Sequence, residues 1–188
     1  MNHADVEKEK SVNIQFTEVL SSEEEYKLHE MQKKVFGSMI DDIEASEDFI
    51  NIPYAHFLLK DGSKIVGFLD LHKSKGSYEG IEVSIGGLSI GILAEYRKYG
   101  YGGKLITYAM EHLKSQSYDF GFLAAAPGTV PLYEKYGWRQ LSIPYTYESI
   151  KGEIKSGTDG MIVPLGNANL VNKIQNGVAP LHVGRGYW

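Results

Sequence analysis

The sequence predicts an α/β protein: a single domain with one mixed, mostly antiparallel sheet flanked by helices. Residues 55–60 and 64–72 are two strand-like runs joined by Asp61-Gly62, which is a strong hairpin signal. A long apolar run at 81–93 is followed by a glycine-rich turn and an amphipathic helix, and a second buried run at 120–126 leads into another helix. Strands and helices in this order build one sheet covered by helices.

The N-terminal part of the chain is expected to form one strand and one helix ahead of the hairpin. Residues 12–19 alternate apolar and polar side chains, as in a half-buried strand. Ser21-Ser22 stands three residues ahead of Glu24-Glu25, which is the spacing of a capping box at a helix start. Apolar residues then recur at helical spacing up to Gly37, where we expect the helix to end.

The remaining elements follow from glycines, apolar runs and charge. Glycines at 86, 87 and 91 lie inside the long central strand and indicate a bulge or the close approach of another backbone or a ligand. We expect turns at residues 73–79 and 151–157, and strands at 140–148 and 158–165. The acidic stretch 38–53 is expected to be a short helix or a loop over the functional site.

The composition indicates one globular domain covering residues 1–188. Apolar residues make up 43% of the chain and charged residues 23%, so the chain can bury its own core. No run of 18 apolar residues is present, and residues 1–11 are polar and expected to be flexible, so we predict neither a membrane span nor a signal peptide. These features lead us to expect a cytoplasmic protein.

Charge, cysteine content and histidine spacing argue against several functions. The net charge of −5 argues against nucleic acid as a partner. The absence of cysteine excludes disulfides, thiolate metal sites and a cysteine acyl-enzyme. None of the six histidines pairs with another at a metal-ligand spacing, so we predict no metal site.

The turn after the central strand has the properties of an anion-binding site. The apolar residues 85–93 are followed by Arg97-Lys-Tyr-Gly-Tyr-Gly-Gly103, which opens directly into an amphipathic helix. The start of a helix offers unpaired N–H groups and partial positive charge, and glycines let the backbone press against a phosphate. Lys104 adds a further cation. A ligand that carries a pyrophosphate is therefore expected here.

Two other phosphate-binding motifs fit these residues badly. The spacing Gly100-x-Gly102-Gly103 lacks the third glycine of the dinucleotide fingerprint, and it lies mid-chain rather than after a first strand. A P-loop would need Ser or Thr after Gly103-Lys104, where Leu105 stands. An unrelated protein that binds ATP or NAD through this loop stays an alternative.

A second motif follows the buried run at 120–126. Pro131 is expected to begin a short helix, with Gly137 as its C-cap. Tyr133 lies in this helix. A phenol with a pKa of about 10 is protonated at neutral pH and can donate a proton to a sulfur anion. The alternative for Tyr133 is that its ring only packs in a core.

Together the two motifs resemble the acetyl-CoA site of the GNAT acyltransferase superfamily. Arg97-x-x-Gly100-x-Gly102 matches the pyrophosphate loop of that superfamily, Gln/Arg-x-x-Gly-x-Gly/Ala, and Leu132-Tyr133 with Gly137-Trp138 matches the second half of its site. The resemblance implies splayed central strands that hold the pantetheine arm of coenzyme A, and a Tyr133 that protonates the departing thiolate. The expected cofactor-binding residues are Ile90, Gly91, Ile92, Arg97, Lys98, Tyr99, Gly100, Tyr101, Gly102, Gly103 and Lys104.

Within the superfamily the chain looks most like the aminoglycoside 2′-N-acetyltransferases. The matching positions are Phe36-Gly37, Tyr96-Arg97, Leu132-Tyr133, Gly137-Trp138, Asp159-Gly160 and an Arg-Gly-…-Trp ending at Trp188. The chain departs from that family at three carboxylates that serve a polycationic sugar. Leu88 stands in place of a glutamate on the central strand, Met39 in place of an aspartate, and Gly186 or Tyr187 in place of another. The resemblance therefore implies the fold and the cofactor more strongly than the antibiotic.

The predicted function is direct transfer of an acetyl group from acetyl-CoA to the amine of a small molecule, with an aminoglycoside as one acceptor. We expect a backbone N–H of the central strand to polarise the thioester carbonyl and Tyr133 to act as the acid. Candidate proton acceptors are Glu82, the Trp188 carboxylate, Asp70 and His72, and the expected acceptor contacts are Asp41, Asp42, Ser89 and Trp188. A non-catalytic acyl-CoA sensor and an enzyme acting on peptide amines are alternatives, and we expect a monomer or a homodimer.

Overall fold

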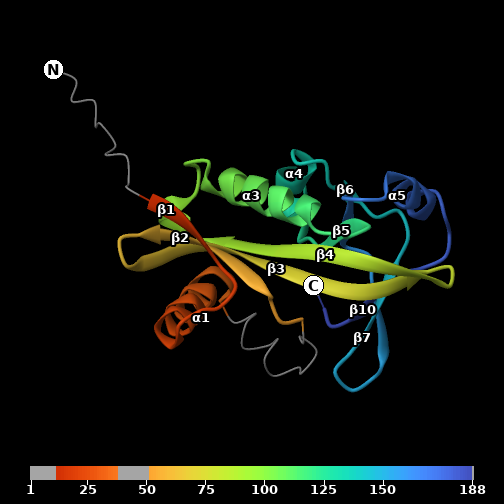
Figure 1. The fold of residues 1–188 in the computed structure, drawn as a ribbon, viewed down its shortest axis with the longest axis horizontal. Coiled ribbons are helices and arrows are strands. Elements are labelled where there is room, and N and C mark those ends of the chain that lie inside the picture. The colour runs from red at the N-terminus through yellow and green to blue at the C-terminus, as the bar shows by residue number, and fades with distance from the viewer. Residues whose placement is uncertain (1–11, 38–50, 188) are drawn as a thin grey trace.

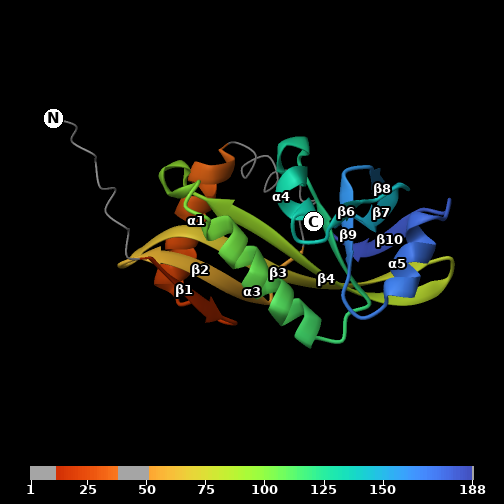
Figure 2. The same ribbon diagram turned by 90° about the horizontal axis from the view of Figure 1, so that it is seen from above.

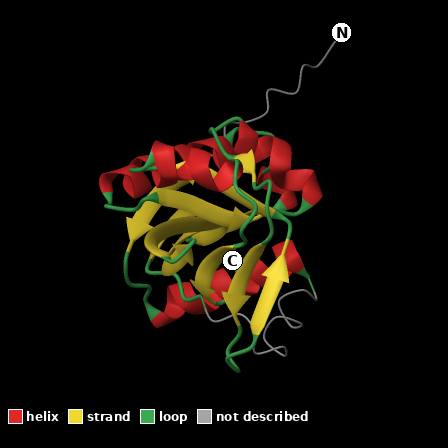
Figure 3. Ribbon diagram, turned by 90° about the vertical axis from the view of Figure 1, so that its right-hand side faces the viewer, coloured by secondary structure: helices red, strands yellow, loops and turns green. Residues whose placement is uncertain are grey.

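The structure is a computed structural model that describes residues 12–37 and 51–187. A single mixed sheet of ten strands forms the centre of the molecule. Helices α3, α4 and α5 lie on one face of the sheet and α1 lies on the other (Figure 1), and the end-on view in Figure 3 shows the sheet between these two layers. The sequence prediction of an α/β domain with a mixed sheet is confirmed.

The elements have the following bounds. The strands are β1 (Val12–Thr17), β2 (Ala55–Asp61), β3 (Lys64–Tyr78), β4 (Ile81–Ile92), β5 (Phe120–Ala124), β6 (Arg139–Gln140), β7 (Tyr145–Glu148), β8 (Ile154–Gly157), β9 (Gly160–Pro164) and β10 (Leu181–Arg185). The helices are α1 (Ser22–Phe36), α3 (Tyr101–Ser115), α4 (Val130–Glu134) and α5 (Ala168–Gln175), with 3-10 turns η1 (Ala94–Tyr96) and η2 (Pro127–Thr129).

The long antiparallel pair β3–β4 organises the sheet. The pair keeps one register from Tyr78 opposite Ile81 to Gly67 opposite Ile92. The first half of β3 carries β2 and then β1 on its other edge, and its second half pairs with β10, followed by β7 and β8. On the far side of β4 lie β5, β9 and β6. The pairs β4–β5 and β10–β7 are parallel, and the others are antiparallel.

Helix α3 forms because its apolar residues recur three and four positions apart. Leu105, Ile106, Ala109 and Leu113 are fully buried on one side of the helix. That side packs on β2, β3 and β4, so α3 lies diagonally across the middle of the sheet (Figure 2). At about 1.5–3 kcal/mol for each fully buried large apolar side chain, this packing fixes the position of the α3 N-terminus at the end of β4.

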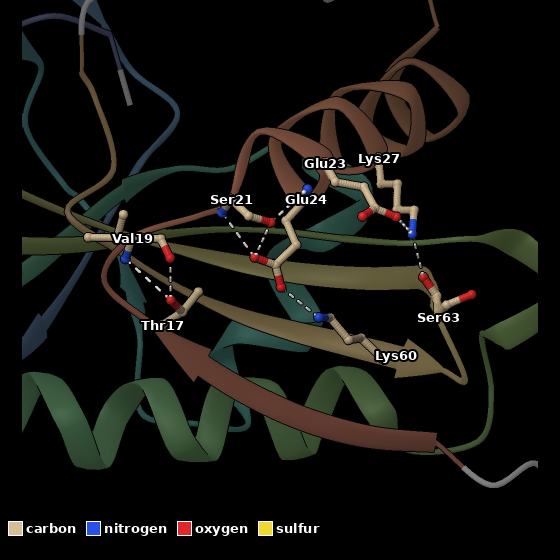
Figure 4. A network of polar contacts seen from close by, with 8 residues as sticks. All are labelled: Thr17, Val19, Ser21, Glu23, Glu24, Lys27, Lys60 and Ser63. Atoms are coloured by element: carbon tan, nitrogen blue, oxygen red, sulfur yellow. Dashed lines mark hydrogen bonds and ion pairs between the residues drawn. The ribbon is translucent and has the colours of Figure 1, made fainter.

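The capping box predicted at the start of α1 is confirmed, with Ser21 as the cap. The Ser21 hydroxyl accepts from the Glu24 N–H (3.3 Å), and the Glu24 carboxylate accepts from the Ser21 N–H (3.0 Å). The other Glu24 oxygen accepts from Lys60 Nζ of β2 (2.7 Å), so the capping residue also links α1 to the sheet (Figure 4). The helix ends before Gly37, as expected.

Two expected turns are placed wrongly. Residues 73–79 are not a turn, because β3 continues to Tyr78 and stays paired with β4, and the chain reverses at Glu79-Gly80, both of which have positive φ. The expected turn at 151–157 contains strand β8. The expected strand at 140–148 is broken after β6 and resumes at Tyr145, after Pro144.

The C-terminal region holds two elements that the sequence pattern did not reveal. Helix α5 is capped by Asn167, whose side chain accepts from the Leu170 N–H (3.0 Å). Strand β10 then enters the sheet between β3 and β7 of its own chain, with Leu181 and Val183 fully buried. Residues 181–185 are therefore part of the core of the sheet.

Candidate active site

The central strands β4 and β5 separate after a short contact. They pair only where Ile85–Gly87 lies beside Phe120–Phe122, although β4 continues five residues further to Ile92. Strand β5 turns away to pair with β9 along its whole length. No other strand in residues 12–37 and 51–187 pairs with this edge of β4 beyond Gly87. The splayed central strands expected from the sequence are thus present.

The free edge of β4 carries defined backbone groups. In an antiparallel pair, residues alternate between those whose N–H and C=O groups bond to the partner strand and those whose groups point away. Leu93 N–H donates to the Val66 carbonyl of β3 (3.0 Å), so the odd-numbered residues of β4 face β3. The groups of Leu88, Ile90 and Ile92 therefore point toward β5. The Leu88 N–H belongs to the last parallel bridge, Gly87 with Phe122, whereas the Leu88 carbonyl and the groups of Ile90 and Ile92 face the region that β5 leaves open.

The same alternation holds where the two strands still meet, since Asp119 N–H donates to the Ser84 carbonyl (2.9 Å). At the other end of the free edge, Arg97 Nε donates to the Ile92 carbonyl (2.9 Å). This contact folds the Arg97 side chain back onto the end of β4, beside the start of α3. Between Gly87 and Ile92, the edge of β4 offers backbone donors and acceptors to an extended ligand.

The glycine-rich turn presents the N-terminus of α3 at the end of this edge. Gly100 is the N-cap and has φ of 78°, a left-handed conformation that glycine adopts without strain. Lys98 also has positive φ, at 71°. The N–H groups of the first turn, from Tyr101 to Gly103, have no carbonyl one turn back within the helix. A side chain at Gly103 would overlap the Tyr136 hydroxyl, so α3 and the segment after α4 pack closely here.

Tyr133 lies on α4, which follows β5 on the far side of the open region. Its side chain is 6% exposed and packs edge-on against Trp138, with ring centroids 6.2 Å apart. Burial raises the pKa of the Tyr133 hydroxyl to about 12, so it is fully protonated at neutral pH. The residue is therefore a proton donor held in a fixed orientation.

An exposed carboxylate, Asp159, stands beside the end of β5. Its carbonyl accepts from the Ala125 N–H (2.9 Å), the residue after β5. The side chain accepts from Tyr145 Oη (2.8 Å) and Tyr187 Oη (3.2 Å), and Tyr147 packs against both tyrosine rings. Burial, together with the Asp159 charge, raises the pKa of Tyr187 to about 12. Both phenols therefore stay protonated and hold the carboxylate in place.

Comparison with known proteins agrees with this geometry. The family model described as "Acetyltransferase (GNAT) domain" matches residues 53–140, which run from β2 to β6. The GNAT family N-acetyltransferase YhbS of Escherichia coli, solved in complex with CoA, is 12% identical with a TM-score of 0.58, and the match covers 92% of this chain and 89% of that one. The chain has the GNAT fold.

Two other solved structures support the same fold. Escherichia coli ElaA is 19% identical with a TM-score of 0.56, and the match covers 81% of this chain and 99% of ElaA. The ribosomal-protein-S18-alanine N-acetyltransferase from Escherichia coli is 13% identical with a TM-score of 0.51, and the match covers 84% of this chain and 97% of that enzyme. A search of curated protein sequences found no match.

The GNAT fold brings most of the predicted cofactor residues together. Ile90 and Ile92 lie on the free edge of β4, and residues 97–104 surround the start of α3. A different reason explains the glycine at position 91, because a side chain there would overlap the ring of Phe68 on β3. A side chain at Gly86 would overlap Tyr118 and Leu113 in the same way. Neither glycine marks a bulge, since the β3–β4 register does not shift.

Apart from Tyr133, the predicted catalytic and acceptor residues divide into three groups. Glu82 is not brought to the site: it lies next to the β3–β4 turn, exposed and paired with Lys75 (2.8 Å), and eight strand residues separate it from Ile90, or about 26 Å. Asp70, His72 and Ser89 lie together on the α1 side of the sheet, beside the free edge of β4. Asp41, Asp42 and Trp188 fall outside the described residues.

The sequence analysis missed two features of the site. The carbonyl of Leu88 joins the backbone groups of Ile90 and Ile92 on the free edge, and the period of two along a strand could have identified it. The Asp159 carboxylate is held by Tyr145 and Tyr187, which come from β7 and from the residues after β10. No local signal links these three residues, because they meet only in the folded sheet.

The described part of the chain shows neither a metal-binding cluster nor a membrane-spanning helix. Within residues 12–37 and 51–187, no three His, Asp or Glu side chains gather in a way that could hold a metal ion. In the same ranges, none of the helices has the length and apolar character needed to cross a membrane.

Proposed function

We propose that this protein is an acetyl-CoA-dependent N-acetyltransferase that moves an acetyl group directly to an amine of a small molecule. The free backbone edge of β4, which runs from the contact with β5 to the N-terminus of α3 with Tyr133 on the opposite side, carries the proposal. This arrangement offers an extended thioester a backbone partner, an anion site and a proton donor. The structural similarity to YhbS, which was solved with CoA, supports it.

The residues present fit two parts of acetyl-CoA, the pyrophosphate and the pantetheine arm. The N–H groups of Tyr101, Gly102 and Gly103 and the cations Lys98 and Lys104 would hold the pyrophosphate. The backbone groups of β4 that point toward β5 would pair with the amides of the pantetheine arm, as an added strand does. When bound there, acetyl-CoA supplies an acetyl group activated as a thioester.

The chain supplies two groups for the acyl transfer. The β4 backbone N–H of Ile90 would stabilise the negative charge that develops on a carbonyl oxygen. Tyr133 would donate its hydroxyl proton to the leaving sulfur, because its raised pKa keeps it protonated until the thiolate forms. Neither role needs a metal ion.

The acceptor is expected to approach from the α1 side of the sheet, since α3 and α4 cover the other side (Figure 1). Ser89 points to the α1 side, and the exposed Asp159 carboxylate would attract a cationic amine. A small polyamine such as an aminoglycoside fits this chemistry. A peptide amine is the alternative acceptor.

One observation favours a second function, a non-catalytic domain that binds acyl-CoA. Leu88 is 4% exposed and apolar at the position where the aminoglycoside 2′-N-acetyltransferases carry a glutamate on the central strand. A chain without a proton acceptor near β4 would bind the thioester and not use it. The two functions share the cofactor site and differ only in turnover.

The test is calorimetric titration with acetyl-CoA, followed by measurement of thiol release with a panel of amines. The panel contains kanamycin, spermidine and a peptide with a free N-terminal alanine, and ATP and NAD serve as competing ligands. Binding with thiol release on kanamycin or spermidine supports the proposal. Release on the peptide alone moves the acceptor to proteins, and binding without release supports the acyl-CoA sensor. Displacement of acetyl-CoA by ATP or NAD at equal concentration contradicts the cofactor assignment.

A further inference from the structure

A cluster of polar side chains is buried on the α1 side of the sheet, directly behind the free edge of β4. Asp70 and His72 on β3 are 3% and 4% exposed. Both point to the same side because they are two residues apart on a strand. His56 on β2 lies opposite Asp70, and Ser89 on β4 lies opposite it on the other side. Three neighbouring strands thus contribute to one cluster.

The contacts divide the cluster into a charged part and a neutral part. The Asp70 carboxylate lies 2.7 Å from His56 Nδ1 and accepts from Gln32 Nε2 of α1 (3.3 Å). His72 Nε2 lies 3.3 Å from Ser89 Oγ. Ser89 is half-buried, so its hydroxyl lies between the buried imidazole and the surface of the sheet. It is also flanked by Leu88 and Ile90, whose backbone groups face the open side of β4.

We propose that Ser89 and His72 form the proton relay that takes the proton from the acceptor amine. The proposal rests on the proposed acetyl transfer, and it assigns the proton acceptor that neither Glu82 nor Leu88 provides. Ser89 Oγ touches the amine, and His72 Nε2 receives the Ser89 hydroxyl proton. His72 therefore acts through Ser89.

In the acetyl transfer, His72 takes up one proton and Tyr133 gives up one. The nitrogen of the amine forms a bond to the acetyl carbon while the carbon–sulfur bond breaks. One N–H proton moves to Ser89 Oγ as the Ser89 hydroxyl proton moves to His72 Nε2, and the sulfur receives the hydroxyl proton of Tyr133. His72 has then gained one proton and Tyr133 has lost one, and exchange with water restores both.

The buried position of His72 keeps its ring neutral before the reaction, as a proton acceptor requires. Burial lowers the pKa of His72 to about 4, so the ring is neutral at pH 7 and its Nε2 can accept. Asp70 opposes that shift and would stabilise the ring once it is charged, whereas His56 adds a small effect in the same direction as burial. Among the described residues, Asp70 and His56 are the titratable groups that act on this ring.

The test compares Ser89→Ala with two matched variants. Ser89→Thr keeps a hydroxyl on the same Cβ. Thr146→Val removes the hydroxyl from a second histidine–hydroxyl pair, His182 Nδ1 with Thr146 Oγ1 (3.1 Å), which lies on β10 and β7 away from the β4 edge. With the panel amine that the wild type uses best, Ser89→Ala should lower kcat about 100-fold at pH 7. The loss should shrink as the pH rises, while acetyl-CoA binding stays constant. Ser89→Thr should recover part of the lost kcat because it keeps a hydroxyl, and Thr146→Val should stay near wild type.

Nuclear magnetic resonance of the histidine rings gives a readout that does not depend on turnover. In the wild type, His72 should carry its proton on Nδ1 from pH 6 to 8, and Ser89→Ala should shift its Nε2 signal while Thr146→Val does not. A His72 ring that titrates near pH 6.5, or a Ser89→Ala variant with wild-type kcat, overturns the relay. If the wild type binds no acetyl-CoA or releases no thiol, the proposed function fails, and this outcome is distinct from a failure of the relay alone.

Discussion

At the scale of single residues, Tyr133 combines burial with a potential chemical role. Its 6% exposure and its contact with Trp138 would suit a core residue, yet an aliphatic side chain could fill that space without a hydroxyl. In the described residues the Tyr133 hydroxyl is not buried without a hydrogen-bond partner, in contrast to Nε1 of Trp138. Its position is therefore compatible with donation to a ligand.

The Tyr133→Phe variant separates packing from chemistry. It keeps the ring and removes only the hydroxyl, so the free energy of unfolding should change by less than about 1 kcal/mol. Thiol release should fall 10- to 100-fold in kcat, because a positioned acid is lost, while acetyl-CoA affinity stays constant. Tyr108→Phe, on an exposed tyrosine of α3, is the control. Steady-state kinetics with calorimetry decide the matter, and unchanged kcat would remove Tyr133 from the mechanism.

His72 also makes stability depend on pH. Its pKa is about 4 in the folded chain and about 6.5 when unfolded, so the unfolded chain binds more protons between these values. The contribution of a neutral His72 to the free energy of unfolding is therefore complete above pH 6.5 and is lost as the pH falls toward 4. About 2.5 pKa units correspond to about 3 kcal/mol. Urea unfolding at pH 7 and pH 4.5 should show this loss in the wild type and a smaller one in His72→Gln. Equal losses in both would contradict it.

At the scale of elements, α1 offers a direct test of local sequence signals. Ser21 and Ser22 were both compatible with a capping box, and the structure selects Ser21. Ser21→Ala should therefore cost about 1 kcal/mol of unfolding free energy, because the Glu24 N–H loses its acceptor. Ser22→Ala is the matched control and should cost little, since alanine is the better helix former at this first helical position. Thermal or urea unfolding would distinguish them, and equal effects would show that the cap contributes nothing.

The elements that the sequence predicted correctly are those with local signals. The helix at 22–36 has its cap, the hairpin at 55–72 has Asp61-Gly62, and the helix at 101–115 has its apolar face. The expected turn at 73–79 was wrong because its lysines and serines look like loop residues. In the structure the lysines are exposed positions of a long strand, and the serines are half-buried positions of the same strand. Its partner strand, 81–92, decided the outcome, and pairing between distant residues is invisible in a local pattern.

The candidate site shows the same division. The glycine turn and Tyr133 lie in short motifs whose order along the chain is informative. Glu82 was a candidate because it is the carboxylate on the same strand as Leu88, where the related family has a glutamate. The extended strand places it about 26 Å from Ile90. The pairing of His72 with Ser89 depends on the β3–β4 register, which one residue of slip would abolish.

At the scale of the whole molecule, β10 joins two halves of the sheet. One half is built on β1 to β6 with β9, and the other consists of β7 and β8, which reach β3 only through β10. The Asp159 carboxylate depends on this connection, since Tyr145 of β7 and Tyr187 after β10 hold it. Strand β10 therefore connects the two halves of the sheet and brings Tyr187 to Asp159, the carboxylate that we propose attracts the acceptor amine.

Two truncations test this dependence. A chain that ends at Pro180 loses β10 and with it the fully buried Leu181 and Val183, each worth about 1.5–3 kcal/mol, and leaves β7 without its neighbour. Against a total stability of about 5–15 kcal/mol, this chain should unfold at much lower urea concentration or fail to fold. A chain that ends at Gly186 keeps β10 and should remain close to the full chain. Trp138 is the single tryptophan in both truncated chains, so its fluorescence reports on the core next to Tyr133. If the two truncated chains unfold at the same urea concentration, β10 does not hold the sheet together.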